Sequence, residues 1–224
     1  MTPHERRTRP ATTSARDPAL ATRVCHHPAV QIPRDLSLRL DAVDGPLADP
    51  TPMRHAAVLA ALLPGEHTRI LLIERASHLR SHAGQLAFPG GKPEPDDRDL
   101  LDTALREAEE EVGLPRSQVQ ILGRLAPVPV PSGYLIIPFV GLVAGNFTPR
   151  SNDAEVKAVL TPTLQQLADP QLYRFAGTRE WQGQRYSLHE FNIHDPPLWG
   201  ATARMVHDLL RRMELVPHNP DAAL

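Results

Sequence analysis

The chain has one cysteine, few aromatic residues and no long apolar run. Cys25 has no partner for an internal disulfide, which is typical of a protein from a reducing cytoplasm. No apolar stretch approaches the roughly 20 residues that span a bilayer, and the basic start of the chain lacks the apolar core of a secretory signal. We therefore expect a cytoplasmic protein without a membrane partner. An aromatic content of 4% also argues against a ligand site built mainly from rings.

A strong excess of either charge is absent as well. The formal net charge is −2, so we expect no general attraction to nucleic acid. The charge is uneven, because residues 1–34 contain six arginines and only two acidic residues. We interpret residues 1–34 as a flexible basic extension. The alternative is a scaffold whose basic N-terminus binds RNA.

The remaining sequence predicts one domain with a mixed sheet. The 224 residues suffice for a single core, and we place that domain at residues 35–216, followed by a tail at 217–224. Strand-like runs occur in groups with helices between the groups, which favours an α+β fold, an α/β/α sandwich, over a doubly wound parallel sheet. We expect strands at 55–63, 68–75, 119–130 and 134–144, a strand running into a short helix at 156–169, a hairpin at 174–191, and helices at 32–43, 99–112 and 197–215.

The segment ALREAEEEVGL, residues 104–114, is unusually rich in carboxylates. On a helix, Glu107, Glu110 and Glu111 lie at positions i, i+3 and i+4 and therefore share one face. A charge run is most often a solvated face, but a solubilising surface usually alternates its signs. Oxygen ligands gathered on one face are what a hard divalent cation such as Mg²⁺ requires. The pattern therefore predicts a metal site on this helix.

The loop before the helix contributes to the same unit. Gly90 and Gly91 let the backbone approach a ligand closely, and Asp97 or Asp99 lies near the predicted helix start. We expect Arg106 to hold a carboxylate of this loop without neutralising the glutamate face.

These residues resemble the Nudix box, G-x5-E-x7-R-E-U-x-E-E-x-G-U, where U is apolar. Matching positions are Gly91, Arg106, Glu107, Ala108, Glu110, Glu111, Gly113 and Leu114. The spacing from Gly91 to Arg106 is 106 − 91 = 15, one more than usual, and Asp97 stands where the first glutamate is expected. The resemblance implies a Nudix fold and hydrolysis of a nucleoside diphosphate derivative with Mg²⁺ or Mn²⁺. It also implies Glu107, Glu110, Glu111 and the Gly91 carbonyl as metal ligands.

An upstream segment, LLIERASHLRSHAGQLAFPGG, resembles the second motif of the coenzyme A diphosphatase branch, L-L-T-x-R-[SA]-x3-R-x3-G-x3-F-P-G-G. The longer spacing within the box is also usual in that branch. The resemblance implies coenzyme A as a small-molecule substrate, cleaved to 3′,5′-ADP and 4′-phosphopantetheine. The substrate-binding residues that it suggests are Arg75, Arg80, Gly84, Gly90 and Lys92. The arginines suit this role because guanidinium groups bind phosphate in a bidentate manner.

Several assignments remain open at this stage. The resemblance implies catalytic roles for Glu110, Glu111 and Arg106, but Glu110 is either a metal ligand or the general base. Asp153 and Glu155 could supply a base or a ligand from another loop. Other substrates are ADP-ribose, NADH or a capped RNA end, and a further alternative is a nucleotide-binding module without catalysis. The chain could act as a monomer or a homodimer.

Overall fold

The computed structural model describes residues 30–47, 53–79, 82–152 and 154–216. Most of the expected N-terminal extension, the whole of the tail at 217–224, and the candidate residues Arg80 and Asp153 therefore lie outside the described residues. In the described part, no helix is long and apolar enough to cross a membrane.

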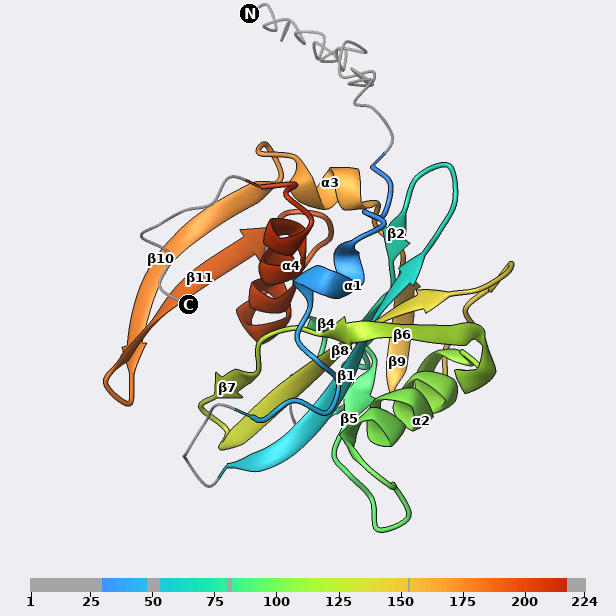
Figure 1. Ribbon diagram of the computed structural model, residues 1–224. Helices are drawn as coiled ribbons and strands as arrows, with labels where there is room; N and C mark the ends of the chain where they lie inside the picture. Colours follow the sequence, from blue (N-terminus) through green and yellow to red (C-terminus); the bar gives the residue numbers. More distant parts are fainter. Residues whose placement is uncertain (1–29, 48–52, 80–81, 153, 217–224) are drawn as a thin grey trace, which may run out of the picture.

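The fold is a mixed α+β arrangement with helices on both sides of a central sheet (Figure 1). Its helices are α1 (Leu36–Arg39), α2 (Leu100–Val112), α3 (Leu164–Ala168) and α4 (Gly200–Arg212), with a 3-10 turn, η2, at Arg116–Gln118. Its strands are β1 (Arg54–Leu63), β2 (Arg69–Ile70), β3 (Leu72–Arg75), β4 (Leu86–Ala87), β5 (Gly90–Gly91), β6 (Val119–Arg124), β7 (Val128–Val130), β8 (Tyr134–Val143), β9 (Val156–Leu160), β10 (Tyr173–Trp181), β11 (Gln184–Phe191) and β12 (Leu198–Trp199).

The central sheet has the order β2-β1-β8-β6, with β5 paired to β1 and β7 paired to β8. Its long strands β1 and β8 are parallel, whereas the other pairs are antiparallel. Both long strands are almost continuously apolar because both of their faces are covered. On β1, Leu59 faces the core on the α2 side, and Leu62 faces the core that contains α4. The expected mixed sheet between helices is confirmed.

Two smaller sheets flank the central one. Strand β3 pairs with β4 and β9, and the hairpin β10–β11 pairs with β12. The hairpin curves over α4 (Figure 1). Between them, His189 and His207 stack with their ring centroids 3.9 Å apart, and the Tyr173 hydroxyl lies 3.0 Å from His189 Nδ1.

Four expected elements differ in the structure. The helix expected at 32–43 is limited to α1, residues 36–39, and the strand expected at 119–130 is divided into β6 and β7. The run 68–75 is divided into β2 and β3, because the chain leaves β1 at Ile70 and pairs with β9 from Leu72 onward. The apolar spacing predicts Leu198 in the last helix. In the structure Leu198 lies in β12 instead and pairs with Phe191 of β11. Helix α4 begins two residues later at Gly200, whose positive φ of 70° permits the change in chain direction.

Candidate active site

Helix α2 is fixed at both ends and along one side. The Asp99 side chain accepts a hydrogen bond from the Asp102 amide at 2.8 Å, and Gly113 ends the helix in the left-handed conformation with φ of 68°. Ala104 and Ala108 are fully buried in the core that α2 shares with β1. The predicted helix at 99–112 is thus confirmed apart from its capping residue. Its small buried side chains bring the other residues of the helix close to β5.

The glycine pair of β5 lies directly against two glutamates of α2. The Gly90 amide donates to Glu111 Oε2 at 3.0 Å. A Cβ atom added at Gly91 would collide with Glu107 Oε1 and would lie 2.6 Å from its carboxyl carbon. A Cβ atom at Gly90 would lie 2.6 Å from the Val58 Cα, on the neighbouring strand. Gly90 therefore requires glycine, because backbone atoms of β1 obstruct an added Cβ atom, whereas a Cβ atom at Gly91 would have to displace the Glu107 carboxylate.

Glu111 is the most buried acidic side chain of the site. It is 2% exposed, and its Oε1 atom has no hydrogen-bond partner among the described residues. Burial raises the pKa of Glu111 to about 8; the Gly90 hydrogen bond opposes this shift, and the charge of Glu107 adds to it. Among the described residues, the cation that pairs with Glu111 is Arg75, whose Nη1 lies 3.8 Å from Glu111 Oε1. The Nε of Arg75 is likewise buried without a partner in the described part of the chain.

Glu107 is the second carboxylate at the glycine pair. Burial raises its pKa, the Arg106 guanidinium opposes that shift, and repulsion from Glu110 and Glu155 adds to it. Glu155 also raises the pKa of Glu111. The loop before β9 therefore brings a third carboxylate close enough to interact electrostatically with both glutamates. This placement is consistent with the open assignment of Glu155 as a base or ligand.

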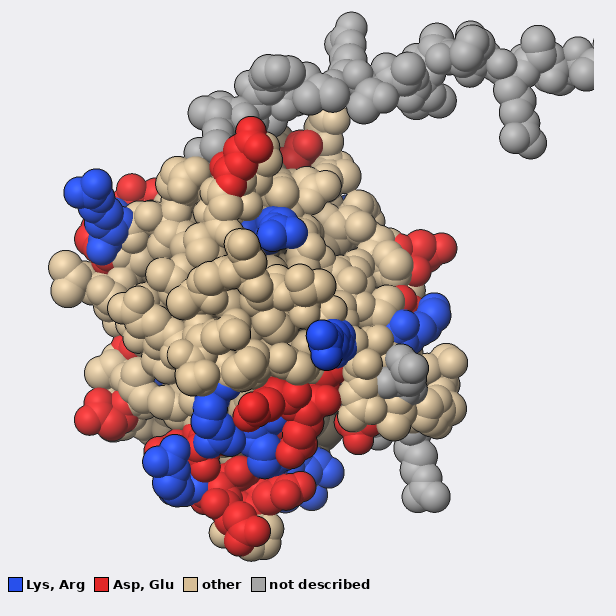
Figure 2. Space-filling view, turned by 90° about the vertical axis from the view of Figure 1, so that its right-hand side faces the viewer, with Lys and Arg blue, Asp and Glu red and all other residues tan. Residues whose placement is uncertain are grey.

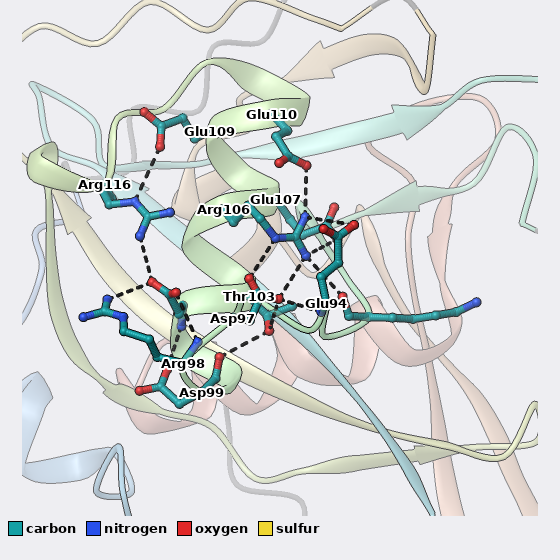
Figure 3. A network of polar contacts seen from close by, with 12 residues as sticks. Glu94, Asp97, Arg98, Asp99, Thr103, Arg106, Glu107, Glu109, Glu110 and Arg116 are labelled. Carbon is teal, nitrogen blue, oxygen red and sulfur yellow. Dashed lines mark hydrogen bonds and ion pairs between the residues drawn. The ribbon is translucent and has the colours of Figure 1, made fainter.

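Arg106 holds the loop and the helix together (Figure 3). Its Nε and Nη2 donate to the two Asp97 oxygens at 2.9 and 3.1 Å, and Nη2 also donates to the Lys92 carbonyl at 3.2 Å. The hydrogen bonds from Arg106 hold the pKa of Asp97 well below its usual range. The expectation that Arg106 binds a carboxylate of the preceding loop is confirmed.

A second expectation about Arg106 is wrong. Its guanidinium also pairs with Glu107 Oε1 at 3.1 Å and with Glu110 Oε2 at 3.0 Å, so it does neutralise part of the glutamate face. The reason is the i,i+4 spacing of Arg106 and Glu110, which places them on adjacent turns. Glu110 turns its carboxylate toward Arg106, and its side chain is 55% exposed (Figure 3).

The candidate metal ligands are therefore arranged unevenly. Glu107 and Glu111 meet Gly90 and Gly91, whereas Glu110 lies on the Arg106 side. Within the ranges that the structure describes, no three His, Cys, Asp or Glu side chains stand ready-made as a metal site. Figure 2 shows acidic and basic side chains concentrated low on the molecule, around α2 and its preceding loop, beneath a mostly uncharged surface. The metal roles of Glu107, Glu110, Glu111 and Gly91 stay predictions.

Of the candidate substrate residues that the structure describes, Arg75 and Lys92 lie beside the carboxylates of the site. Arg75 ends β3 and faces Glu111, and the Gly84 amide donates to the Arg75 carbonyl at 3.0 Å, closing the intervening loop. Gly84 has a φ of 69°, which favours glycine. Lys92 is exposed, and its Nζ lies 5.5 Å from the centre of the Tyr134 ring.

Sequence reasoning missed one buried ionic group beside Arg75. Glu74 is 3% exposed, and its two oxygens meet Lys157 Nζ at 2.8 Å and His194 Nε2 at 3.2 Å. These contacts join β3 to β9 and to the segment before β12, so they fix the end of the strand that carries Arg75. A glutamate inside the apolar run LLIER was the available signal, since a buried acid requires a partner.

The site can be compared with known proteins. The family model for the NUDIX domain matches residues 53–182. A protein from Photorhabdus laumondii subsp. laumondii, described as an uncharacterized Nudix hydrolase, NudL, is 39% identical over 162 residues, covering 72% of this chain and 86% of that protein. A protein of the same description from Yersinia pestis strain Pestoides F is 40% identical over 162 residues, covering 72% and 81%. A crystal structure of a Nudix hydrolase from M. smegmatis, RenU, has 24% identity, 52% and 74% coverage and a TM-score of 0.44.

Proposed function

Because the chain belongs to the Nudix hydrolase family, we propose that it hydrolyses the pyrophosphate bond of coenzyme A. The products are 3′,5′-ADP and 4′-phosphopantetheine. The observation that carries the proposal is the Glu111 carboxylate, buried between the glycine pair and Arg75 with one oxygen unpartnered in the described part of the chain. A buried carboxylate held in this way is costly unless a ligand completes it.

The residues present fit a divalent cation. Glu107 and Glu111 offer oxygen atoms beside Gly90 and Gly91, which carry no side chains, and burial raises the pKa of Glu111 because its charged form lacks compensation there. Glu107, Glu111 and the Gly91 carbonyl would hold Mg²⁺ or Mn²⁺, with Glu110 as a further candidate ligand. When bound, the ion supplies neutralisation of the diphosphate charge and a water of lowered pKa.

The chain's own residues supply orientation and proton transfer. Water must attack one phosphorus in line with the departing phosphate oxygen. Glu110, Glu111 and Glu155 are candidates for the base that accepts the proton of that water. Arg106 keeps Glu107 and Glu110 in position, and Arg75 offers a guanidinium to the phosphate oxygens next to Glu111.

The choice of coenzyme A depends on the segment from Leu71 to Gly91, which resembles the motif of coenzyme A diphosphatases. The structure supports this choice by the place of Arg75, since the motif arginine faces the buried Glu111. We also propose the cytoplasm as the compartment, because Cys25 is the one cysteine of the chain.

A substrate panel tests the proposal. Coenzyme A, ADP-ribose, NADH and capped RNA are incubated with the protein in Mg²⁺ and in Mn²⁺, and kcat/KM is compared. We expect the highest kcat/KM for coenzyme A. Preference for ADP-ribose, NADH or capped RNA would reject the substrate, and nucleotide binding without turnover of any substrate would indicate a module that has lost catalysis.

A further inference from the structure

Two cations share one tyrosine ring next to the glycine pair. The guanidinium carbon of Arg54 lies 4.2 Å from the centre of the Tyr134 ring, and Lys92 Nζ lies 5.5 Å from the same centre. Arg54 Nη2 also donates to the Ser132 carbonyl at 3.2 Å. Among the described residues, neither Arg54 nor Lys92 forms an ion pair.

The pairing of the strands explains why these residues meet. Arg54 and Tyr134 are directly opposite each other at the start of the parallel pair β1–β8. Strand β5 runs antiparallel to β1 with Gly91 opposite Ala57, so Lys92 comes next and continues toward Arg54. Nothing in the local sequence of any of the three indicates this meeting, because it depends on two separate strand pairings.

The cluster lies beside the proposed diphosphate site. The Lys92 carbonyl accepts a hydrogen bond from Arg106 Nη2 at 3.2 Å, and Gly91 touches Glu107. The backbone of Lys92 therefore belongs to the carboxylate network, while its ammonium group extends from that network to the Tyr134 ring. The length of the Lys92 side chain is thus the distance between the carboxylate network and the pair formed by Arg54 and Tyr134.

The charges of the cluster favour an anion. Two exposed like charges repel each other, and a cation–π contact at an exposed site offsets only part of that cost. An anion that both Arg54 and Lys92 contact would offset the repulsion, and the two side chains offer it guanidinium and ammonium N–H donors beside the Tyr134 ring. This set of donors suits a terminal phosphate better than a carboxylate, because a terminal phosphate offers three oxygen acceptors.

We propose that Arg54, Lys92 and Tyr134 form a subsite for a phosphate monoester of the substrate. On the proposed function, this group is the 3′-phosphate of coenzyme A, which one ribose separates from the pyrophosphate. Arg54 is then a residue that determines specificity, outside both recognised sequence motifs. Arg75 is left free to serve the pyrophosphate beside Glu111.

The test compares coenzyme A with dephospho-coenzyme A, which lacks the 3′-phosphate. In the Arg54→Gln variant we expect kcat/KM for coenzyme A to fall about tenfold or more, mainly through KM, while kcat/KM for dephospho-coenzyme A stays unchanged. Arg69→Gln is the matched control, because Arg69 is an exposed arginine of β2 that pairs with Leu63 at the far end of β1, and it should change neither value. An equal fall for both substrates, or no fall for coenzyme A, would overturn the subsite.

A binding measurement separates this inference from the proposed function. If the wild-type protein hydrolyses neither compound, the proposed function fails, and the subsite is tested by calorimetry with 3′,5′-ADP and 5′-AMP in EDTA. We expect the wild-type protein to bind 3′,5′-ADP about tenfold more tightly than 5′-AMP, and Arg54→Gln to lose that preference. Equal affinities in the wild-type protein, or an unchanged preference in the variant, would contradict the subsite.

Discussion

Arg75 Nη1 lies 3.8 Å from Glu111 Oε1, and Arg75 Nε and Glu111 Oε1 are both buried without a hydrogen-bond partner among the described residues. The two side chains approach each other without a close hydrogen bond. Each has capacity left for a ligand, cationic at Glu111 and anionic at Arg75. This arrangement is the basis for the proposed site, in which a divalent cation would meet Glu111 and a diphosphate would meet Arg75.

Replacing Glu111 with glutamine should preserve the fold and reduce turnover at least about 100-fold, because glutamine can accept the Gly90 hydrogen bond but carries no charge and cannot take a proton. Steady-state kinetics at saturating Mg²⁺ measure the effect. Glu109→Gln on the same helix is the control, since Glu109 pairs with Arg116 away from the glycines. Near-normal turnover of Glu111→Gln would remove Glu111 from the catalytic group.

The same variant should stabilise the metal-free protein at high pH. The pKa of Glu111 is raised to about 8 from 4.5 in the unfolded chain, so the native state retains a proton that the unfolded state releases. Stability therefore falls as the pH rises from 4.5 to 8, and Glu111→Gln should remove this loss, on the order of 2–4 kcal/mol at pH 8. Thermal unfolding in EDTA at pH 5 and pH 8 measures the difference. A Tm gap between the two proteins that does not grow with pH would contradict the burial of a titrating Glu111.

Adding Mg²⁺ at pH 8 should raise the Tm of the wild-type protein, because an ion that binds the native state stabilises it by mass action. The rise should be much smaller in Glu111→Gln, which loses a charged ligand. A titration of Tm against Mg²⁺ concentration, without any substrate, makes the comparison. An equal rise in both proteins would place the bound ion elsewhere.

A methyl group at Gly91 should displace the Glu107 carboxylate, since the added Cβ atom would collide with Glu107 Oε1. We expect Gly91→Ala to fold and to lose about 100-fold in kcat, the scale of a misplaced catalytic group. Gly65→Ala is the matched control, because its new Cβ atom would have only an ordinary contact of 3.6 Å with the His67 carbonyl. Activity of Gly91→Ala equal to that of the control would show that Glu107 need not touch the glycine.

Protonation of the buried histidines should destabilise the protein in acid. Burial lowers the pKa of His189 from 6.5 to about 3, with the charges of His207 and Arg204 adding to the shift, and burial also lowers the pKa of His207. Below about pH 6.5 these histidines bind protons in the unfolded chain but stay neutral in the native state. The free energy of unfolding therefore falls as the pH drops from 6.5 toward 3. Thermal unfolding between pH 7 and pH 4.5 should show a smaller decline in His189→Gln than in the wild-type protein. The same decline in both would mean that other groups control acid unfolding.

The parts of the fold that depend on local signals were predictable from the sequence. Helix α2 is determined by the capping residue Asp99, the apolar spacing and the stop at Gly113, all within one short segment. The hairpin β10–β11 was predictable for the same reason, because its turn at Gln182 and Gly183 divides two strand-like runs.

The features that depend on distant partners could not be predicted in this way. Ile70 and Leu72 belong to one apolar run but pair with different strands, and only the arrangement of the sheets decides where the run divides. In the site, the helical spacing placed Glu107, Glu110 and Glu111 on one face. The spacing did not predict that the Glu110 carboxylate would pair with Arg106 and not meet the glycines, because side-chain rotamers depend on the surrounding charges.

The most direct test of the central claim is hydrolysis of coenzyme A in ¹⁸O-labelled water with Mg²⁺, followed by mass spectrometry of the products. The account predicts 3′,5′-ADP and 4′-phosphopantetheine in equal amounts, with a single ¹⁸O atom in one of the two products. The Glu111→Gln variant should form these products only at its low residual rate. Intact coenzyme A, or cleavage at any bond other than the pyrophosphate, would contradict it.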